Sequence, residues 1–357
     1  MQVSYAIYRD DPFWIAPLLM DIKKVFSDRN PFFQHAEMSL WVATAGGRDV
    51  GRIAGIIDRA YNEYQSDRAA FFGFFECCND PQVSRALFQA AYAWARQKDL
   101  QRILGPMNPT NNDECGLLVE GFDSAPALMM SYNPRYYVDL IAAEGFQKAK
   151  DLLAFHIDVG QTPQERLERI AAIFGRRQQD LDVRMVLRKN LKRDLAKINE
   201  VYNEAWQKNW GFVPMTDAEI SYMAERLKPI LMEGLVWIAE SPKEPAGFIL
   251  ALPDFNEAIQ PLKGRLLTPR LIGFLPYLLG RKRPRRIRLI ALGVKKKYRG
   301  RGIESVMFAQ TFQVLLKAGF KACEASWILE DNIEVQRVIE LFGGKPYKTY
   351  RIYERSL

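Results

Sequence analysis

The chain is poor in the side chains that most often bind metals or form disulfides. Its 357 residues include two histidines, His35 and His156, and four cysteines, none of which forms a CxxC pair. A structural zinc site needs four such ligands at short, regular spacings. We therefore expect no metal site, and the unpatterned cysteines indicate a reduced compartment such as the cytoplasm.

Long apolar runs and an excess of acidic charge are missing too. No stretch reaches the ~18 apolar residues of a membrane-spanning helix, and the N-terminal MQVSYAIYRDD has no signal segment. Lys and Arg number 50 against 42 Asp and Glu, a net charge of +8. The partner is therefore expected to be anionic: a phosphorylated cofactor, an acidic membrane surface or nucleic acid. Nucleic acid is unlikely, because the basic residues cluster compactly without interleaved aromatics.

The loop at residues 294–305 lacks both the GxGxxG and the GK[ST] patterns of common nucleotide-binding loops. It nevertheless joins an apolar strand pattern, RIRLIALGV, to an apolar helical pattern. Gly300 and Gly302 allow the backbone to approach a phosphate, and a helix N-terminus attracts anions. Arg299 and Arg301 add charge-assisted hydrogen bonds. The pattern predicts a phosphate site, with a solvated basic turn as the alternative.

The two halves of the chain repeat one order of elements. Strand–turn–strand patterns begin at Trp41 and Trp237, a separation of 196 residues, and similar final strands follow Gly145 and Gly343, a separation of 198. Strands interleaved with helices predict a mixed α/β sheet. We expect two tandem domains, residues 1–160 and 183–357, joined by a linking helix at 161–182.

Within each half, the apolar periodicity predicts a helix before the hairpin, then a central strand, a helix and a further strand. The expected ranges are Ala16–Phe26, Ala69–Phe75, Pro81–Gln97 and Arg102–Leu104 in the first half, and Leu191–Trp206, Arg286–Val294, Gly302–Ala318 and Ala322–Leu329 in the second.

The glycine turn after the central strand of the second half resembles the GNAT superfamily of acyl-CoA-dependent N-acyltransferases. The family pattern is Q/R-x-x-G-x-G/A, and here it reads Arg299-Gly300-Arg301-Gly302-Ile303-Glu304, with Glu304 in place of a small residue. We expect Glu304 to point outward. The first half passes from strand to helix through Asn79-Asp80-Pro81, so it resembles a copy without the CoA loop.

The resemblance implies which residues bind acyl-CoA. Backbone groups of the strand would pair with the pantetheine arm, with a bulge aiming an amide at the thioester carbonyl. The glycine turn and the start of its helix would hold the pyrophosphate, and an asparagine would open the later helix. These residues are Leu292, Gly293, Val294, Arg299, Gly300, Arg301, Gly302, Ile303, Glu304, Ser305 and Asn332.

The sequence indicates the residues that act as catalytic acid and base less clearly than the acyl-CoA site. The family often has a tyrosine after the asparagine as acid for the thiolate, but VQRVIELF has none. Tyr350 of the final strand is the expected substitute, with Tyr347 and Tyr353 as alternatives. Glu330 and Glu324 are the expected candidates for a base that takes the amine proton. Glu330 could instead cap the following helix.

An apolar and basic insert is expected at residues 253–285. It contains LLTPRLIGFLPYLLGRKRPRR, in which Leu267, Leu271, Phe274, Leu275 and Leu278 follow helical spacing. Cations follow at once, so residues 266–288 suit a membrane headgroup boundary. The alternative is an internal helix whose arginines bind CoA phosphate.

The whole chain is similar to a group of bacterial tandem-GNAT proteins that share the strings GP.N...NDECGLL..GFD and YNP.YY. Here these span residues 105–123 and 132–137. The group is similar to bacterial ceramide-type N-acyltransferases. The resemblance implies transfer of a long acyl chain from acyl-CoA to the primary amine of an amphiphilic acceptor, at the inner face of the membrane. The alternatives are a soluble N-acetyltransferase acting on a small polar amine, a non-catalytic binding module and a tRNA-dependent aminoacyl transferase.

Overall fold

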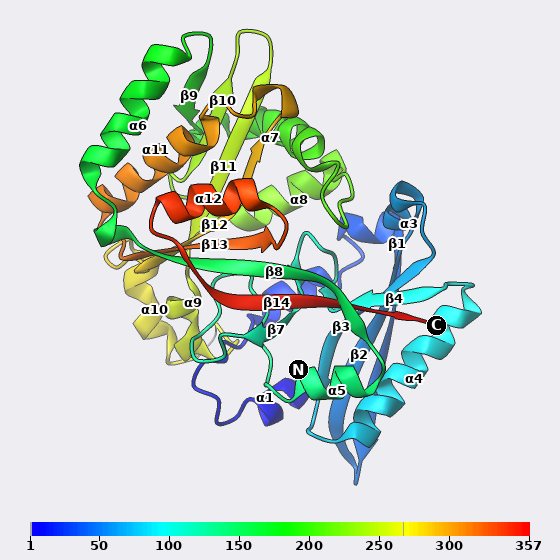
Figure 1. Ribbon diagram of the computed structural model, residues 1–357. Coiled ribbons are helices and arrows are strands. Elements are labelled where there is room, and N and C mark those ends of the chain that lie inside the picture. The colour runs from blue at the N-terminus through cyan, green and yellow to red at the C-terminus, as the bar shows by residue number, and fades with distance from the viewer. Residues whose placement is uncertain (1, 267) are drawn as a thin grey trace. The chain divides into compact units, whose positions relative to one another are not determined.

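The chain divides into two compact units in a computed structural model that describes residues 2–266 and 268–357 (Figure 1). Unit 1 comprises residues 1–153, 259–271 and 348–357, and unit 2 comprises residues 154–258 and 272–347. Strands β8 (Gln147–Asp158) and β14 (Lys345–Ser356) each contribute residues to both units. The domain limits at residues 160 and 182 stay predictions from the sequence.

Unit 1 is built on strands in the order β1-β2-β3-β4-β14, in which β3 and β4 are parallel and the other pairs are antiparallel. Phe72, Phe88 and Phe146 fill the core between the sheet and its helices. The other elements are α1 (Gln2–Ile7), α2 (Leu19–Val25), β1 (Ala36–Ala45), β2 (Arg48–Asp58), α3 (Arg59–Gln65), β3 (Ala69–Cys77), α4 (Pro81–Gln97), β4 (Arg102–Gly105), β5 (Met107–Asn108), β6 (Glu114–Cys115), β7 (Leu117–Glu120) and α5 (Tyr137–Ala143).

Unit 2 repeats the plan with strands in the order β13-β12-β11-β10-β9. Only β12 and β13 are parallel among these pairs. Helix α7 packs its apolar face, including Val201 and Tyr202, on Ile238 and Phe248 of the hairpin. The elements are α6 (Gln164–Arg177), β9 (Asp182–Met185), α7 (Leu191–Trp206), α8 (Asp217–Leu227), β10 (Val236–Glu240), β11 (Pro245–Pro253), α9 (Asn256–Ile259), α10 (Leu271–Leu278), β12 (Arg286–Val294), α11 (Ile303–Ala318), β13 (Ala322–Leu329) and α12 (Ile333–Leu341).

The predicted mixed α/β sheet is confirmed, and most element limits agree with the sequence patterns. The helix predicted at Ala16–Phe26 is shorter, Leu19–Val25, because Pro17 disfavours helical geometry at Ala16 and the backbone of Leu18 is extended, with a ψ of 125°. Of the predicted apolar face in the insert, Leu267 lies outside the described residues. No helix in the described part of the chain is long and apolar enough to cross a membrane.

Equivalent hairpin glycines in the two units support the duplication. Gly51 lies opposite Cys77 at the end of β3, and Gly247 lies opposite Val294 at the end of β12. A Cβ at Gly51 would lie 2.8 Å from Leu87 of α4, and one at Gly247 would lie 3.1 Å from Ile303 of α11. Each glycine therefore lets the helix after the central strand approach its hairpin closely.

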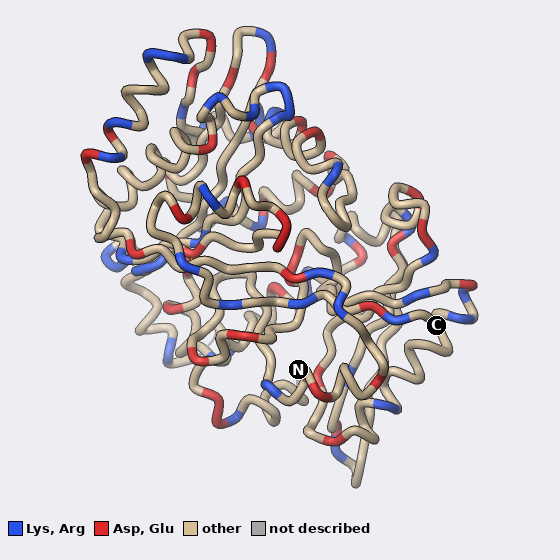
Figure 2. The backbone as a smooth tube through the Cα atoms, in the orientation of Figure 1, with Lys and Arg blue, Asp and Glu red and all other residues tan. Residues whose placement is uncertain are grey.

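Charge is distributed over both units, with Lys and Arg interspersed with Asp and Glu (Figure 2). The net charge is nevertheless uneven: unit 1 holds 21 Lys and Arg against 20 Asp and Glu, and unit 2 holds 29 against 22, so nearly all of the net charge of +8 lies in unit 2.

We predict that Gly247→Ala destabilises the protein by about 1–3 kcal/mol, because the new Cβ would lie 3.0 Å from the backbone oxygen of Gly293. Gly175→Ala in α6 is the matched control. Its Cβ would meet nothing within 4 Å, so it should gain about 0.5 kcal/mol from the higher helix propensity of alanine. Thermal unfolding followed by circular dichroism measures both. Equal midpoints for the two variants would contradict the close approach.

Candidate functional site

The parallel strands β12 and β13 separate before they end. Their pairing runs only from Arg286 opposite Ala322 to Leu289 opposite Ala325, although β12 continues to Val294. On the other side of β12 the register shifts, because Ala251 faces Leu289 whereas Leu250 faces Ala291. Ile290 is therefore a bulge residue that bends β12 at the point of separation. The sequence led us to expect a bulge within residues 292–294, so it lies slightly earlier than expected.

The separation leaves one edge of β12 unpaired with β13 over residues 290–294. Leu292, Gly293 and Val294 still pair with β11 on the opposite side. Such an opening presents backbone N–H and C=O groups to an extended ligand, as an edge strand does. The three residues predicted to pair with the pantetheine arm thus lie along this opening.

A short basic turn connects the end of β12 to α11. Gly300 and Gly302 adopt left-handed φ values of 73° and 81°, which residues with a Cβ adopt only at a cost. Gly302 is the N-cap of α11 and has no side chain with which to cap it. The first N–H groups of a helix have no partner within the helix. The amides of Ile303 to Ser305 are therefore suited to an anion, with the helix dipole adding attraction.

The equivalent position in unit 1 is closed. Asp80 caps α4, and its carboxylate accepts a hydrogen bond of 2.8 Å from the amide of Gln82. Pro81 at the first helical position has no N–H to offer. The Asp80 carboxylate thus fills the start of α4 and would repel a phosphate there.

The two arginines of the turn are engaged by protein acceptors. Arg299 donates to the backbone oxygens of Ala205, at 2.9 Å, and of Val294, at 3.3 Å. Arg301 donates to Gln178 at 2.7 Å and forms an ion pair with Asp180. Both guanidinium groups therefore brace the turn against α7 and the segment after α6. If the two arginines also contact a pyrophosphate, as predicted from the sequence, they would do so through guanidinium N–H groups that do not take part in these hydrogen bonds.

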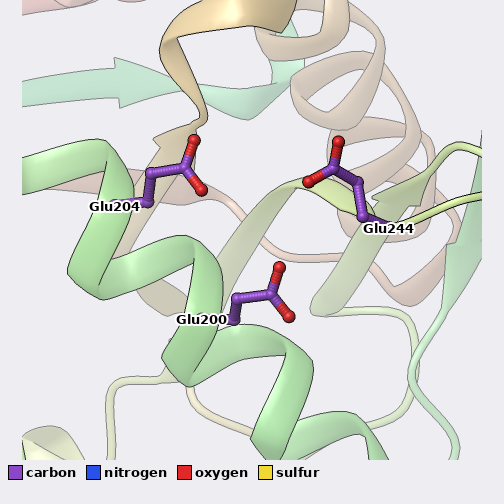
Figure 3. Close-up of side chains that lie close together, drawn as sticks. All are labelled: Glu200, Glu204 and Glu244. Carbon is purple, nitrogen blue, oxygen red and sulfur yellow. The ribbon is translucent and has the colours of Figure 1, made fainter.

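Lys295, the first residue after β12, is held by three carboxylates. Glu200 and Glu204 of α7 and Glu244 of the β10–β11 turn point toward one another (Figure 3), and the Lys295 ammonium pairs with all three. Burial alone would lower the pKa of Lys295, but these hydrogen bonds raise it above its ordinary value. Hydrogen bonds from Lys297 and Lys295 lower the pKa of Glu244 to about 2. The cluster fixes the end of β12, where the turn begins.

Glu304 lies in the first turn of α11 and is half-buried. The sequence led us to expect that its side chain points outward, so it is less exposed than expected. Burial raises the pKa of its carboxyl above the usual range and the Glu334 carboxylate adds to this, whereas a hydrogen bond from the backbone N–H of Glu304 itself and the charge of Arg299 oppose it. The carboxyl therefore gains its proton at a higher pH than an exposed glutamate does.

A second polar group lies at the start of the β12–β13 pair. Glu324 is fully buried, and it accepts hydrogen bonds from Ser326, at 2.7 Å, and from the hydroxyl of Tyr347. Arg288, opposite Glu324 in the pairing, is 1% exposed and donates to the Ser326 hydroxyl at 3.0 Å. A buried carboxylate and a buried guanidinium are thus joined through one serine. This network lies next to the point where the strands separate.

The other predicted catalytic residues lie elsewhere. Glu330 is in the turn after β13, where its backbone oxygen accepts from Gln336 at 3.0 Å. Asn332 caps α12, accepting from the amide of Val335 at 3.3 Å. Tyr350 is fully buried in the part of β14 that belongs to unit 1, opposite Leu118 of β7.

Arg288, Ser326 and Tyr347 were not assigned to the site from the sequence, although Tyr347 was considered as an acid. One signal was available: Arg288 is a charge within the apolar strand RIRLIALGV, and a buried charge requires a partner. The partners themselves lie 36 or more residues along the chain, so the sequence could not identify them.

Residues of the polar string at 132–137 form hydrogen bonds within unit 1. Asn133 is buried and forms hydrogen bonds with both backbone groups of Leu118, at 2.7 and 3.1 Å. Tyr136 donates to the backbone oxygen of Cys77, and Tyr137 donates to the carboxylate of Glu76, each at 2.8 Å. These bonds tie the long loop to the end of β3.

Comparison with known proteins agrees with this geometry. The sequence pattern of the Acetyltransferase (GNAT) family matches residues 195–343. A protein of Caulobacter vibrioides, named bacterial ceramide synthase, is 37% identical over 97% of this chain and 91% of its own length. The chain belongs to the GNAT acetyltransferase family. It is accordingly an N-acyltransferase that uses acyl-CoA as co-substrate.

Two further proteins are similar to this chain, one in sequence and one in fold. Protein YghO of Escherichia coli is 34% identical over 99% of this chain and 90% of its own. A tandem GNAT protein from the clavulanic acid biosynthesis pathway has the same fold, with a TM-score of 0.59 at 13% identity, covering 98% of this chain and 92% of that one. The predicted tandem GNAT architecture is thereby confirmed.

We predict that Glu304→Gln strengthens CoA binding severalfold at about pH 8, because it removes a negative charge near the phosphates. A raised carboxyl pKa means that the wild-type side chain gains its proton as the pH falls, so the difference should shrink toward about pH 5. Calorimetric titration with CoA at several pH values measures this. Glu334→Gln is a milder comparison, and a Glu304→Gln effect that is independent of pH would contradict the assignment.

Proposed function

We propose that this GNAT protein transfers a long-chain acyl group from acyl-CoA to the primary amine of an amphiphilic acceptor. The observation that carries the proposal is the 37% identity to a bacterial ceramide synthase over nearly the full length of both chains. The similarity spans both units, so it is not limited to the half that carries the glycine turn. Small polar amines remain the principal alternative.

The donor would bind along the opening between β12 and β13. Backbone groups of Leu292, Gly293 and Val294 would pair with the pantetheine arm, and the amides of Ile303 to Ser305 would bind the pyrophosphate. The uncapped start of α11 supports this assignment, because its amides need an acceptor. Gly300 and Gly302 would keep the path to those amides free of side chains.

Glu324 is our preferred base. An acceptor amine is an ammonium at neutral pH, so it loses one proton to solvent before its nitrogen attacks the thioester carbon. A second proton leaves the nitrogen as the amide forms, and Glu324 would take that proton. As the C–N bond forms, the C–S bond breaks and the CoA thiolate departs. Glu324 is supported by its burial and by its bonds to Ser326 and Tyr347, which fix its orientation. Glu330 is the second candidate for this role.

A tyrosine hydroxyl would return a proton to the departing thiolate. Tyr347 is supported by its bond to Glu324, which places a phenol beside the proposed base. In this arrangement Tyr347 gives its hydroxyl proton to the departing sulfur. The proton that Glu324 takes from the amine nitrogen then passes to Tyr347 and restores its hydroxyl. Tyr350, the choice from the sequence, is kept as the competing candidate.

An amphiphilic acceptor partitions into bilayers. The proposal therefore locates the reaction at the cytoplasmic face of a membrane, with residues 266–288 as the contacting segment.

The proposal predicts substrate preferences for both donor and acceptor. Purified protein should acylate a long-chain amine with palmitoyl-CoA at least tenfold more efficiently than with acetyl-CoA, since each buried methylene of the chain adds binding energy of about 0.8 kcal/mol. Product formation is measured by mass spectrometry, with a short polar amine as the comparison acceptor. If the protein prefers acetyl-CoA and the polar amine, the proposal is wrong and the protein is instead an N-acetyltransferase of small polar amines.

We predict that Glu324→Gln lowers kcat by about 10²–10⁴ while leaving palmitoyl-CoA affinity within about threefold, because it removes proton acceptance and keeps the side-chain shape. Glu330→Gln is the matched control and should retain most activity. Tyr347→Phe against Tyr350→Phe separates the two phenols in the same assay. A large loss only in Glu330→Gln would assign the base to Glu330 instead.

A further inference from the structure

An exposed apolar stripe lies on α10, in the insert of unit 2. Ile272, Leu275 and Leu279 are 72%, 41% and 64% exposed, which makes them three of the large apolar side chains most open to solvent in the described chain. Their spacing of three and four residues puts them on one face of the helix and its final turn. The opposite face is anchored, because Tyr277 is buried.

The stripe differs from the apolar face expected from the sequence. Of those residues, Leu275 belongs to the stripe, whereas Leu271 and Phe274 are only partly exposed. Apolar residues surround this helix, so periodicity alone did not decide which face would pack and which would remain open.

A basic segment follows the stripe directly. Arg281, Lys282, Arg283 and Arg285 are all exposed, and none forms an ion pair with a carboxylate among the residues that the structure describes. Lys282 lies over the ring of Tyr277, at 4.9 Å, which keeps its charge next to the helix. The one acidic neighbour with a described contact is Glu257, which accepts from the backbone N–H of Arg285 at 3.3 Å. Four cations therefore adjoin the apolar stripe, and none of their side chains forms an ion pair in the described part of the chain.

We infer that Ile272, Leu275 and Leu279 insert into the interface of a bilayer that carries anionic lipids, while Arg281, Lys282 and Arg283 bind its headgroups. The eight-residue helix is about 12 Å long, far too short to span a bilayer, so it would lie in the interface. An anionic membrane supplies an apolar layer and negative charge side by side, as the surface requires. The inference deepens the proposed function by naming the residues of its membrane contact.

The chemistry favours this occupant over a second copy of the chain. A second copy would present the same stripe with the same four cations, and an interface symmetric about this surface would bring like charges together. Association through the stripe is therefore opposed by the residues that favour a membrane.

Vesicle binding tests the inference without any substrate. We expect the protein to sediment with vesicles containing about 30% phosphatidylglycerol, and much less with pure phosphatidylcholine. We expect each of two double variants, Ile272→Ser/Leu279→Ser and Arg281→Glu/Arg283→Glu, to weaken vesicle binding at least about tenfold. Added salt should weaken vesicle binding by the wild type, because it screens the attraction between the cations and the headgroups, but not by Arg281→Glu/Arg283→Glu.

The chain offers a matched control. Leu40 and Val42 on β1 are 60% and 57% exposed but adjoin no such basic run, so Leu40→Thr/Val42→Thr should bind vesicles as the wild type does. Equal losses in the control and in the α10 variants, or no vesicle binding by the wild type, would overturn the inference. So would a change of oligomeric state in the α10 variants, measured by light scattering, because the stripe would then cover a second copy.

Assays with a water-soluble short-chain amine separate this inference from the proposed function. The two double variants, at Ile272 and Leu279 and at Arg281 and Arg283, should retain acyl transfer to that acceptor. None of these four residues belongs to the proposed acyl-CoA site or to the proposed acid and base. Vesicle binding without acyl transfer to any lipid amine would contradict the proposed function and leave the docking surface intact. Acyl transfer to lipid amines that is unchanged in the α10 variants would contradict the docking surface alone.

Discussion

The first amides of an α-helix have no partner within the helix, and the two halves of this protein meet that constraint differently. In unit 1 the Asp80 carboxylate satisfies the start of α4, and Pro81 removes one donor altogether. In unit 2 Gly302 leaves the start of α11 open to an external anion. The N-cap residue thus differs between the two copies, while the surrounding strands and helices keep the same order, and we propose that only the copy with Gly302 binds an anion at this position.

The rest of unit 2 holds that open helix start in position. The bulge at Ile290 bends β12 away from β13, so an opening leads toward the turn. Lys295 fixes the beginning of the turn through three carboxylates, and Arg299 and Arg301 fix its middle through bonds to Ala205 and Asp180. Arg299 and Arg301 can therefore act by positioning the backbone of the turn, whose amides would contact the ligand. Preorganised amides cost little reorganisation when a ligand binds.

Local patterns in the sequence predicted the elements well, because apolar periodicity and glycine turns act over a few residues. The strands at Arg286–Val294 and Ala322–Leu329 and the helix at Pro81–Gln97 have the predicted limits. Long-range contacts were less accessible. The bond of Tyr347 to Glu324 joins residues 23 apart in different strands, and the division of β14 between two units depends on contacts along the whole chain. The interaction of Glu304 with Glu334 of α12 likewise could not be predicted, because no local rule positions α12 beside the start of α11.

We propose that one acyl-CoA binds per chain, at the start of α11 and along the opening beside β12. Hydrogen–deuterium exchange with and without palmitoyl-CoA tests this binding site most directly, because it reports on backbone amides one segment at a time. We expect slower exchange at Ile303 to Ser305 and in residues 290–294, with no change at the start of α4. Protection at Gln82 to Ser84, or none in either unit, would contradict it.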